Sequence, residues 1–271
     1  MKLNLITLLF YSALVLNPVN LFSQSKKHFW NFEKTPVWSD EFDTGSIPDS
    51  SKWTFETGGD GWGNNELQYY TDRDNVKIES GLLKITAKKE NRNNRKYTSS
   101  RLITKNKGGW KYGRIEIRAK MPAGRGLWPA FWMLPQNFKS FSGVSKGEID
   151  ILEYVGYEPD IVHFSLHTKA NNSLLGNEIT KSKKAAKADK YFHIYRMDWA
   201  SYGIRGYIDG KKYFEYLNNG KGKKYWPFNE IFFLIINLAV GGDWGGYKGV
   251  DNSIFPATLE IDYVRVYEFL K

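Results

Sequence analysis

The chain has 271 residues, 41% hydrophobic and 25% charged, and this globular composition excludes a disordered or collagen-like chain. It contains no cysteine, which excludes disulfides, thiol catalysis and thiolate metal sites. The net charge of +10 would suit nucleic acid or an acidic partner. However, no nucleic-acid-binding motif is present, and the pattern of glycines, aromatic rings and acids argues against a nucleic-acid partner.

The N-terminal residues 1–23 are typical of a secretory signal peptide. A short positive start, Met1-Lys2, precedes an apolar run of 11 residues from Ile6 to Leu16. A membrane-spanning helix needs about 20 apolar residues, so this run is too short to be one. An uncleaved, buried N-terminal helix is the alternative. We expect cleavage after Ser23 and a secreted or periplasmic mature domain, residues 24–271, that has no membrane segment.

The mature chain has the alternating pattern of β-strands and almost no helical period. Residues 114–121 alternate apolar and charged side chains, as a strand with one buried face does. Similar stretches are residues 82–88, 161–168, 191–199, 230–240 and 259–267. Asp209-Gly210 predicts a hairpin, and the lysine-rich residues 180–190 are the one candidate helix. We expect an all-β sandwich of two sheets, with a barrel as the alternative.

Three acidic residues lie close together in the segment Gly147-Glu148-Ile149-Asp150-Ile151-Leu152-Glu153-Tyr154. Glu148 and Asp150 share one face of a strand, but strict alternation would bury Glu153 in the core. A β-bulge at Ile151-Leu152 would return Glu153 to the acidic face. We therefore expect three carboxylates in a row on one face.

Such a row can perform acid–base and nucleophilic chemistry. The Cα atoms of Glu148 and Glu153 would lie roughly 13 Å apart, and inward-reaching side chains could bring the carboxylates to the roughly 5–5.5 Å of a retaining glycosidase. Crowding of like charges raises the pKa of at least one of them, which supplies a general acid near neutral pH. A solvated acidic edge strand or a calcium-binding face is the alternative.

The longer motifs resemble glycoside hydrolase family 16, in its laminarinase-like, endo-β-1,3-glucanase branch. The matching stretches are residues 38–42, 61–71, 124–134, 147–153, 237–242 and 261–267. They run in order from about residue 36 to 268, which is nearly the whole mature chain. The resemblance implies a β-jelly roll of two curved antiparallel sheets, with a substrate cleft on the concave face.

The resemblance also implies roles for individual residues. Glu148 is then the nucleophile, Glu153 the acid and base, and Asp150 the residue that holds and tunes Glu148, with retention at the anomeric carbon. His163 and His167 share the face opposite the core, and we expect them to hydrogen-bond sugar hydroxyls or Glu153. The remaining candidate substrate-binding residues are Asn65, Arg101, Trp110, Trp128, Trp132, Asn237 and Trp244.

Two further features of the family concern a sugar subsite and a structural ion. Laminarinase-like sequences usually carry Trp-Pro just before the catalytic strand, whereas residues 141–146 here contain neither residue. This departure puts one sugar subsite in doubt. The family often holds a structural calcium ion, for which Glu41, Gly81 and Asp262 are the candidate ligands. Catalysis itself is expected to need no cofactor.

The resulting hypothesis is a secreted, monomeric endo-β-1,3-glucanase that acts on laminarin-type β-glucan. Another member of the same family could instead cleave mixed-linkage glucan or a sulfated galactan, and the latter would suit the positive charge. The lysines, however, cluster at residues 181–190 and 221–224, outside the strand motifs, where a solvated surface is the usual interpretation. A non-catalytic β-glucan-binding protein is a third reading, which the presence of both Glu148 and Glu153 disfavours.

Overall fold

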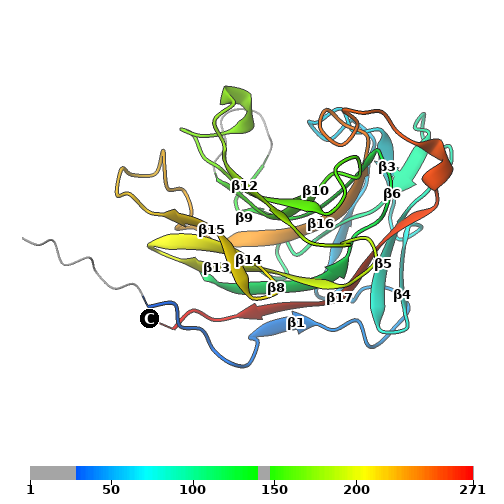
Figure 1. Cartoon of the computed structure of the whole chain (residues 1–271). Coiled ribbons are helices and arrows are strands. Elements are labelled where there is room, and N and C mark those ends of the chain that lie inside the picture. Colours follow the sequence, from blue (N-terminus) through cyan, green and yellow to red (C-terminus); the bar gives the residue numbers. More distant parts are fainter. Residues whose placement is uncertain (1–28, 140–146, 271) are drawn as a thin grey trace, which may run out of the picture.

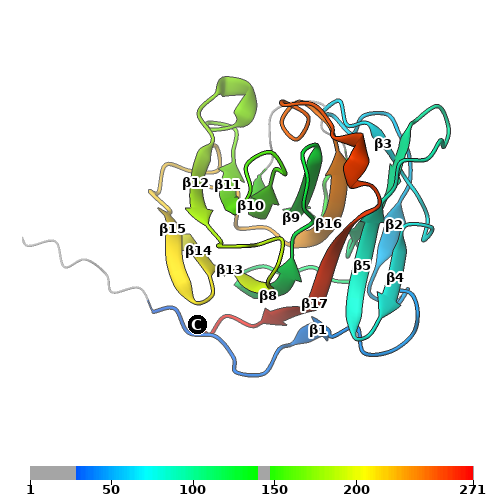
Figure 2. The ribbon, with the colours of Figure 1, turned by 45° about the vertical axis from the view of Figure 1, so that its right-hand side comes forward.

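The computed structural model describes residues 29–139 and 147–270. Two large antiparallel sheets stack face to face and curve together, as Figures 1 and 2 show. This arrangement is the predicted β-jelly-roll sandwich. The predicted signal peptide, residues 1–23, lies outside the described residues. Within the described ranges, no helix is both long and apolar enough to cross a membrane.

The first sheet has eight strands and forms one of the two layers. Its order is β15 (Lys211–Leu217), β14 (Gly203–Ile208), β13 (His193–Ala200), β8 (Gly113–Lys120), β17 (Ala257–Tyr267), β5 (Leu82–Ala87) and β4 (Val76–Glu79), with β1 (Trp38–Asp40) also paired to β17. In β8, every second residue is buried, which confirms the alternation expected for residues 114–121. The strand therefore contributes one face to the core and one to the surface.

The second sheet has seven strands and carries the candidate site. Its order is β12 (Ile179–Lys184), β11 (Ile161–His167), β10 (Glu148–Tyr154), β9 (Leu127–Pro135), β16 (Phe232–Val240), β7 (Arg101–Ile103) and β2 (Thr54–Glu56). All nine residues of β16 are buried, so this strand is covered on both faces. It is an interior strand of the sheet, between β9 and β7.

Smaller elements complete the fold. A short parallel pair, β3 (Gln68–Tyr70) and β6 (Tyr97–Ser99), forms a separate two-stranded sheet. The 3-10 turns η1 (Ser173–Leu175) and η2 (Asn252–Ile254) lie in connections between strands. The predicted hairpin at Asp209-Gly210 joins β14 to β15, and both turn residues have positive φ, at 49° and 75°. These are the dihedrals that an Asp-Gly hairpin turn requires.

The helix expected at residues 180–190 is wrong. Ile179–Lys184 form β12, which pairs with β11 at the edge of the second sheet, and a turn follows. Lysines on an edge strand discourage pairing with another chain. The local cluster of lysines therefore reflects the exposed edge of a sheet and not a helical surface.

Candidate active site

A cavity of about 560 Å³ opens on the face of the seven-stranded sheet that points away from the core. Its floor comes from β9, β10, β11, β12 and β16, so it crosses most of the width of the sheet. Nine of the predicted site residues line it: Glu148, Asp150, Glu153, Trp128, Trp132, His163, His167, Asn237 and Trp244. Residues from four strands and from the loop after β16 thus meet at one surface.

A β-bulge in β10 places all three acids on the cavity side. The register with β9 shifts between Asp150 and Leu152, and the register with β11 shifts between Asp150 and Glu153. As a result Ile151 and Leu152 are both buried in the core, while Glu153 faces the cavity. The bulge expected from the conflict between alternation and burial is confirmed at the residues where it was predicted.

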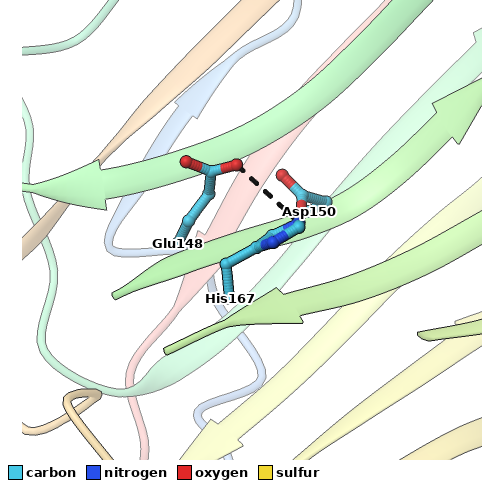
Figure 3. A group of neighbouring side chains, drawn as sticks. All are labelled: Glu148, Asp150 and His167. Atoms are coloured by element: carbon cyan, nitrogen blue, oxygen red, sulfur yellow. Dashed lines mark ion pairs between the residues drawn. The ribbon is translucent and has the colours of Figure 1, made fainter. Parts of the chain in front are cut away.

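His167 lies between two of the carboxyl groups, as Figure 3 shows. Its Nε2 is 3.1 Å from Asp150 Oδ2 and 3.9 Å from Glu148 Oε1. It projects from β11, where its Cα is the direct partner of Glu148. His163 is the β11 partner of Glu153, next to the bulge. Its Nε2 lies 3.4 Å from Glu158 Oε2, and burial lowers the pKa of its ring. The two histidines therefore contact different acids.

The three carboxyl groups hold their protons to unusually high pH. Burial is the main cause, and it raises the pKa of Glu148, Asp150 and Glu153 to about 8 each. The charge of Asp150 raises the pKa of both glutamates further, while the His167 ring lowers them. Arg101 also lowers the pKa of Glu148. Groups this close titrate together, so the cluster is partly protonated near neutral pH.

Aromatic rings border the carboxyl groups. The Trp128 and Trp244 rings meet edge to face with centroids 5.6 Å apart, and Trp244 contacts the His163 ring at 4.9 Å. Trp132 lies on β9, directly opposite Asp150 of β10, and its Nε1 donates to Asn237 Oδ1 at 2.7 Å. Flat apolar rings beside hydrogen-bonding groups are a surface that suits a sugar, which has apolar faces and a polar rim.

Three predicted sugar-binding residues lie outside the cavity lining. Arg101 is the β7 partner of Asn237 and is buried beside the cavity, where it pairs with Glu56 at 2.6 Å and lies 4.8 Å from the centroid of the Trp132 ring. Asn65 is exposed and donates to Asp243, a lining residue, at 2.9 Å. Trp110 packs against the Trp38 ring and the core instead. The structure therefore does not bring Trp110 to the site.

The comparisons with known proteins agree with this geometry. The family model described as glycosyl hydrolases family 16 matches residues 63–265. A beta-glucanase of Rhodothermus marinus is 48% identical over 244 residues, which cover 87% of this chain and 85% of that protein. The chain belongs to glycosyl hydrolase family 16.

Solved structures of laminarinases have the same fold as this family 16 chain. The laminarinase of Rhodothermus marinus superposes with a TM-score of 0.85 at 46% identity, and the match covers 89% of this chain and 99% of that one. The laminarinase of Flavobacterium sp. UMI-01 gives 0.79 at 44% identity, covering 86% and 100%. The β-jelly roll expected from the resemblance is thus confirmed.

The residues considered for a structural calcium ion do not fit one. Glu41 receives two hydrogen bonds from the Arg265 guanidinium, at 2.7 and 3.0 Å, and Asp262 is paired with Arg118 at 2.5 Å. Gly81 is in the tight turn between β4 and β5, with a φ of 72°. Arginines occupy both oxygens of Glu41 and one oxygen of Asp262, so this donor set leaves calcium far fewer than the about 6–8 oxygen ligands it takes. Catalysis in family 16 needs no cofactor.

The group best placed for a metal lies among the acids of β10. In the described ranges, the ligand atoms of Glu148, Asp150 and His167 lie within 4.8 Å of one another. The same grouping also suits acid–base chemistry, in which the two carboxyl groups and the His167 ring exchange or stabilise protons. It therefore needs no metal ion to explain it.

Sequence reasoning gave no role to several residues that line the cavity. Glu66 is buried and lines it from the segment before β3, and Leu174 is 91% exposed on η1. Glu66 stands inside one of the family motifs, which is a signal that could have drawn attention to it. Leu174 lies in a loop between β11 and β12, and nothing in its local sequence indicates that the loop reaches the site.

Proposed function

We propose that this family 16 protein is an endo-acting β-1,3-glucanase that cleaves laminarin-type β-glucan with retention of anomeric configuration. The observation that carries the proposal is the bulged strand β10, which presents Glu148, Asp150 and Glu153 together in an aromatic-lined cavity. The likeness to laminarinases over 86–89% of the chain supports the choice of β-1,3-glucan.

The first chemical step forms a covalent intermediate. A Glu148 carboxylate oxygen attacks the anomeric carbon, and the bond from that carbon to the leaving oxygen breaks. Glu153 donates its proton to the leaving oxygen in the same step, so the departing chain leaves as a neutral alcohol. The raised pKa of Glu153 keeps that proton available near neutral pH.

The second step releases the sugar. The Glu153 carboxylate takes a proton from water, the water oxygen attacks the anomeric carbon, and the ester bond to Glu148 breaks. Two inversions give net retention. His167 favours the ionised form of both glutamates, Arg101 that of Glu148, and hydrogen bonds from Trp128 and Ser165 that of Glu153. The assignment of Glu148 as the nucleophile therefore rests on its place in the family motif and not on a difference in pKa.

Asp150 couples the two glutamates. Its carboxyl group is 5% exposed, and its Oδ2 lies 3.1 Å from His167 Nε2. Because its charge raises the pKa of both neighbours, it helps to keep one proton in the cluster at neutral pH. Asp150 is therefore a residue that tunes the pair and not a second nucleophile.

The test is product release from a panel of polysaccharides by purified residues 24–271. Laminarin, lichenan, agarose, porphyran and κ-carrageenan are compared, with Glu148→Ala as the control. A ladder of short oligosaccharides from laminarin alone, absent with Glu148→Ala, is the expected result. Activity only on a sulfated galactan would overturn the proposed substrate and give the basic surface a function. Residues 141–146, where the family's Trp-Pro is missing, lie outside the described residues, so lichenan directly tests linkage preference.

We also propose that the protein is exported and acts as a monomer. The signal-like residues 1–23 support export, and no further sequence feature indicates a partner other than β-glucan. N-terminal sequencing of protein recovered from the periplasm and the medium should find Gln24 as the first residue. Light scattering of that material should give the mass of one chain, and a mass of two chains would contradict the monomer.

A further inference from the structure

Glu66 is a buried carboxylate in the cavity wall that the chemical steps do not use. Its exposed fraction is 4%, and it accepts hydrogen bonds at Oε2 from Gln68 Nε2 at 2.6 Å and from the Tyr70 hydroxyl at 3.0 Å. Asn64 Nδ2 lies 3.4 Å from its Oε1. Burial raises the pKa of Glu66, and Gln68 and the charge of Arg101 act to lower it.

The orientation of Gln68 is fixed independently. Its Oε1 accepts the backbone N–H of Val240 on β16 at 2.7 Å, so its amide nitrogen must be the group that faces Glu66. An amide nitrogen can only donate. Glu66 is therefore required to act as an acceptor at Oε2, as an ionised carboxylate does.

The same acceptor sets the direction of a chain of hydrogen bonds. The Tyr70 hydroxyl has one proton, and when it donates that proton to Glu66 its oxygen accepts from Asn237 Nδ2, 3.2 Å away. The oxygen of the Asn237 amide then faces Trp132 and accepts its indole N–H at 2.7 Å. Since the indole can only donate, the chain from Trp132 through Asn237 and Tyr70 to Glu66 has one self-consistent direction.

At its far end from Glu66, this chain of hydrogen bonds reaches the Trp132 ring, which lies beside β10. Trp132 lines the cavity opposite Asp150, and the Arg101 guanidinium lies 4.8 Å from its ring centroid. Arg101 is itself held by Glu56 at 2.6 Å. The guanidinium restrains the ring at its face, and Asn237 restrains it at its N–H edge. Rotation of the ring would break a hydrogen bond inside a buried network.

We propose that Glu66 is a positioning residue that fixes the Trp132 ring, through Tyr70 and Asn237, in the orientation that stacks a glucose ring beside Glu148 and Asp150. The inference rests on the proposed function, because it takes Trp132 as a sugar platform. It also gives the small β3–β6 pair a purpose, since Gln68 and Tyr70 both belong to β3. The side chain that binds sugar is on β9, and the group that orients it is outside both large sheets.

The first test is Tyr70→Phe, which removes the middle hydroxyl and keeps the ring. Loss of one hydrogen bond predicts a roughly three- to tenfold rise in KM for laminari-oligosaccharides, with a smaller change in kcat. The matched control is Tyr69→Phe. Tyr69 directly precedes Tyr70 in β3 and is not part of the chain of hydrogen bonds. A Tyr70→Phe enzyme with the KM of the control would overturn the proposal.

A double-mutant cycle separates positioning from a general loss of stability. Trp132→Phe removes the indole N–H, so adding Tyr70→Phe to it should raise KM no further if the two residues act through one chain. Additive effects would overturn the proposal. If Tyr70→Phe does not fold, Glu66→Gln with Trp132→Phe forms the same cycle, because an amide at position 66 disrupts the acceptor.

The proposed function and the proposed role of Glu66 can fail independently. If the wild-type protein releases no product from laminarin, the proposed function fails. If it is active and the cycle is additive, only the role of Glu66 fails. Tryptophan fluorescence on titration with laminaritriose, in a Glu148→Ala background, measures binding without turnover. The Kd values of the variants should follow the same order as their KM values.

Discussion

Charged side chains are arranged in opposite ways on the outer faces of the two sheets. On the eight-stranded sheet, acids and bases stand directly opposite one another on neighbouring strands, as with Asp198 and Arg114 at 2.8 Å and Glu260 and Lys120 at 2.8 Å. On the seven-stranded sheet, three acids stand together on one strand. In the described part of the chain, His167 is the only base within 4.0 Å of Glu148 or Asp150.

The difference shows that each face meets a different requirement. Cross-strand pairs of opposite charge stabilise a sheet, and like charges side by side destabilise it. The eight-stranded sheet therefore contributes to holding the fold. The cavity face gives up stability so that its carboxyl groups hold protons at neutral pH, which is a common cost of a catalytic site.

The largest expected effect is on turnover by Glu148→Gln. An amide cannot form the covalent ester, so kcat on laminarin should fall by about 10⁴-fold or more. Initial rates of reducing-end release measure the loss, and circular dichroism checks that the fold is kept. Activity within tenfold of the wild type would contradict the assignment of the nucleophile.

Glu153→Gln should lose somewhat less activity, on the order of 10²–10⁴-fold, because it removes proton transfer and not the nucleophile. With an aryl glycoside, whose leaving group needs no proton, azide should restore turnover since it attacks without a general base. The product should be a β-glycosyl azide, detected by NMR. Absence of rescue, or rescue of Glu148→Gln with the same anomer, would contradict the roles given to the two residues.

The same change, aspartate to asparagine, should have opposite effects on stability when it is made on the eight-stranded sheet and on the seven-stranded sheet. Asp198→Asn removes the ion-pair partner of Arg114 and leaves Arg196 with the more distant Glu116, at 3.8 Å, so it should lower the free energy of unfolding by about 1–3 kcal/mol. Asp150→Asn removes charge repulsion, and it should raise that free energy by a similar or smaller amount at pH 8. Urea unfolding of the two variants and the wild type gives both values.

The gain from Asp150→Asn should depend on pH. A carboxyl group whose pKa is raised in the folded state favours folding below its unfolded pKa, and this contribution is lost as the pH rises through the folded value of about 8. The difference between Asp150→Asn and the wild type should therefore be small at pH 5 and grow toward pH 9. A constant difference over that range would contradict the raised pKa.

The smallest expected effect is on the pH optimum of Asp150→Asn. The charge of Asp150 raises the pKa of Glu148 and Glu153, so an asparagine lowers both. The two limbs of the pH profile of kcat/KM should move to lower pH together, by about one unit or less. Residual activity of the variant on laminarin, measured from pH 4 to 10, checks this. A shift to higher pH would overturn the tuning role.

Much of the site could be predicted because its signals are local. Alternation along a strand gives the face of each residue, and it placed Trp128 with Trp132 and His163 with His167 correctly. The bulge could be predicted from the same rule, since an unpaired glutamate is too costly to bury. The failure at residues 180–190 has a physical cause as well. A short polar edge strand has no strong period of its own and forms because β11 offers it a partner.

The sequence by itself determined which residue types follow one another, and therefore the strand faces, the bulge and the family. Only the tertiary structure decided which strands became neighbours, because pairing brings together residues far apart in the chain. That is why Arg101 lies over the face of the Trp132 ring, why Trp110 packs against the core, and why Glu41 pairs with Arg265. The link from Glu66 to Trp132 joins β3, β16 and β9 by contacts between side chains, and no spacing in the sequence encodes it.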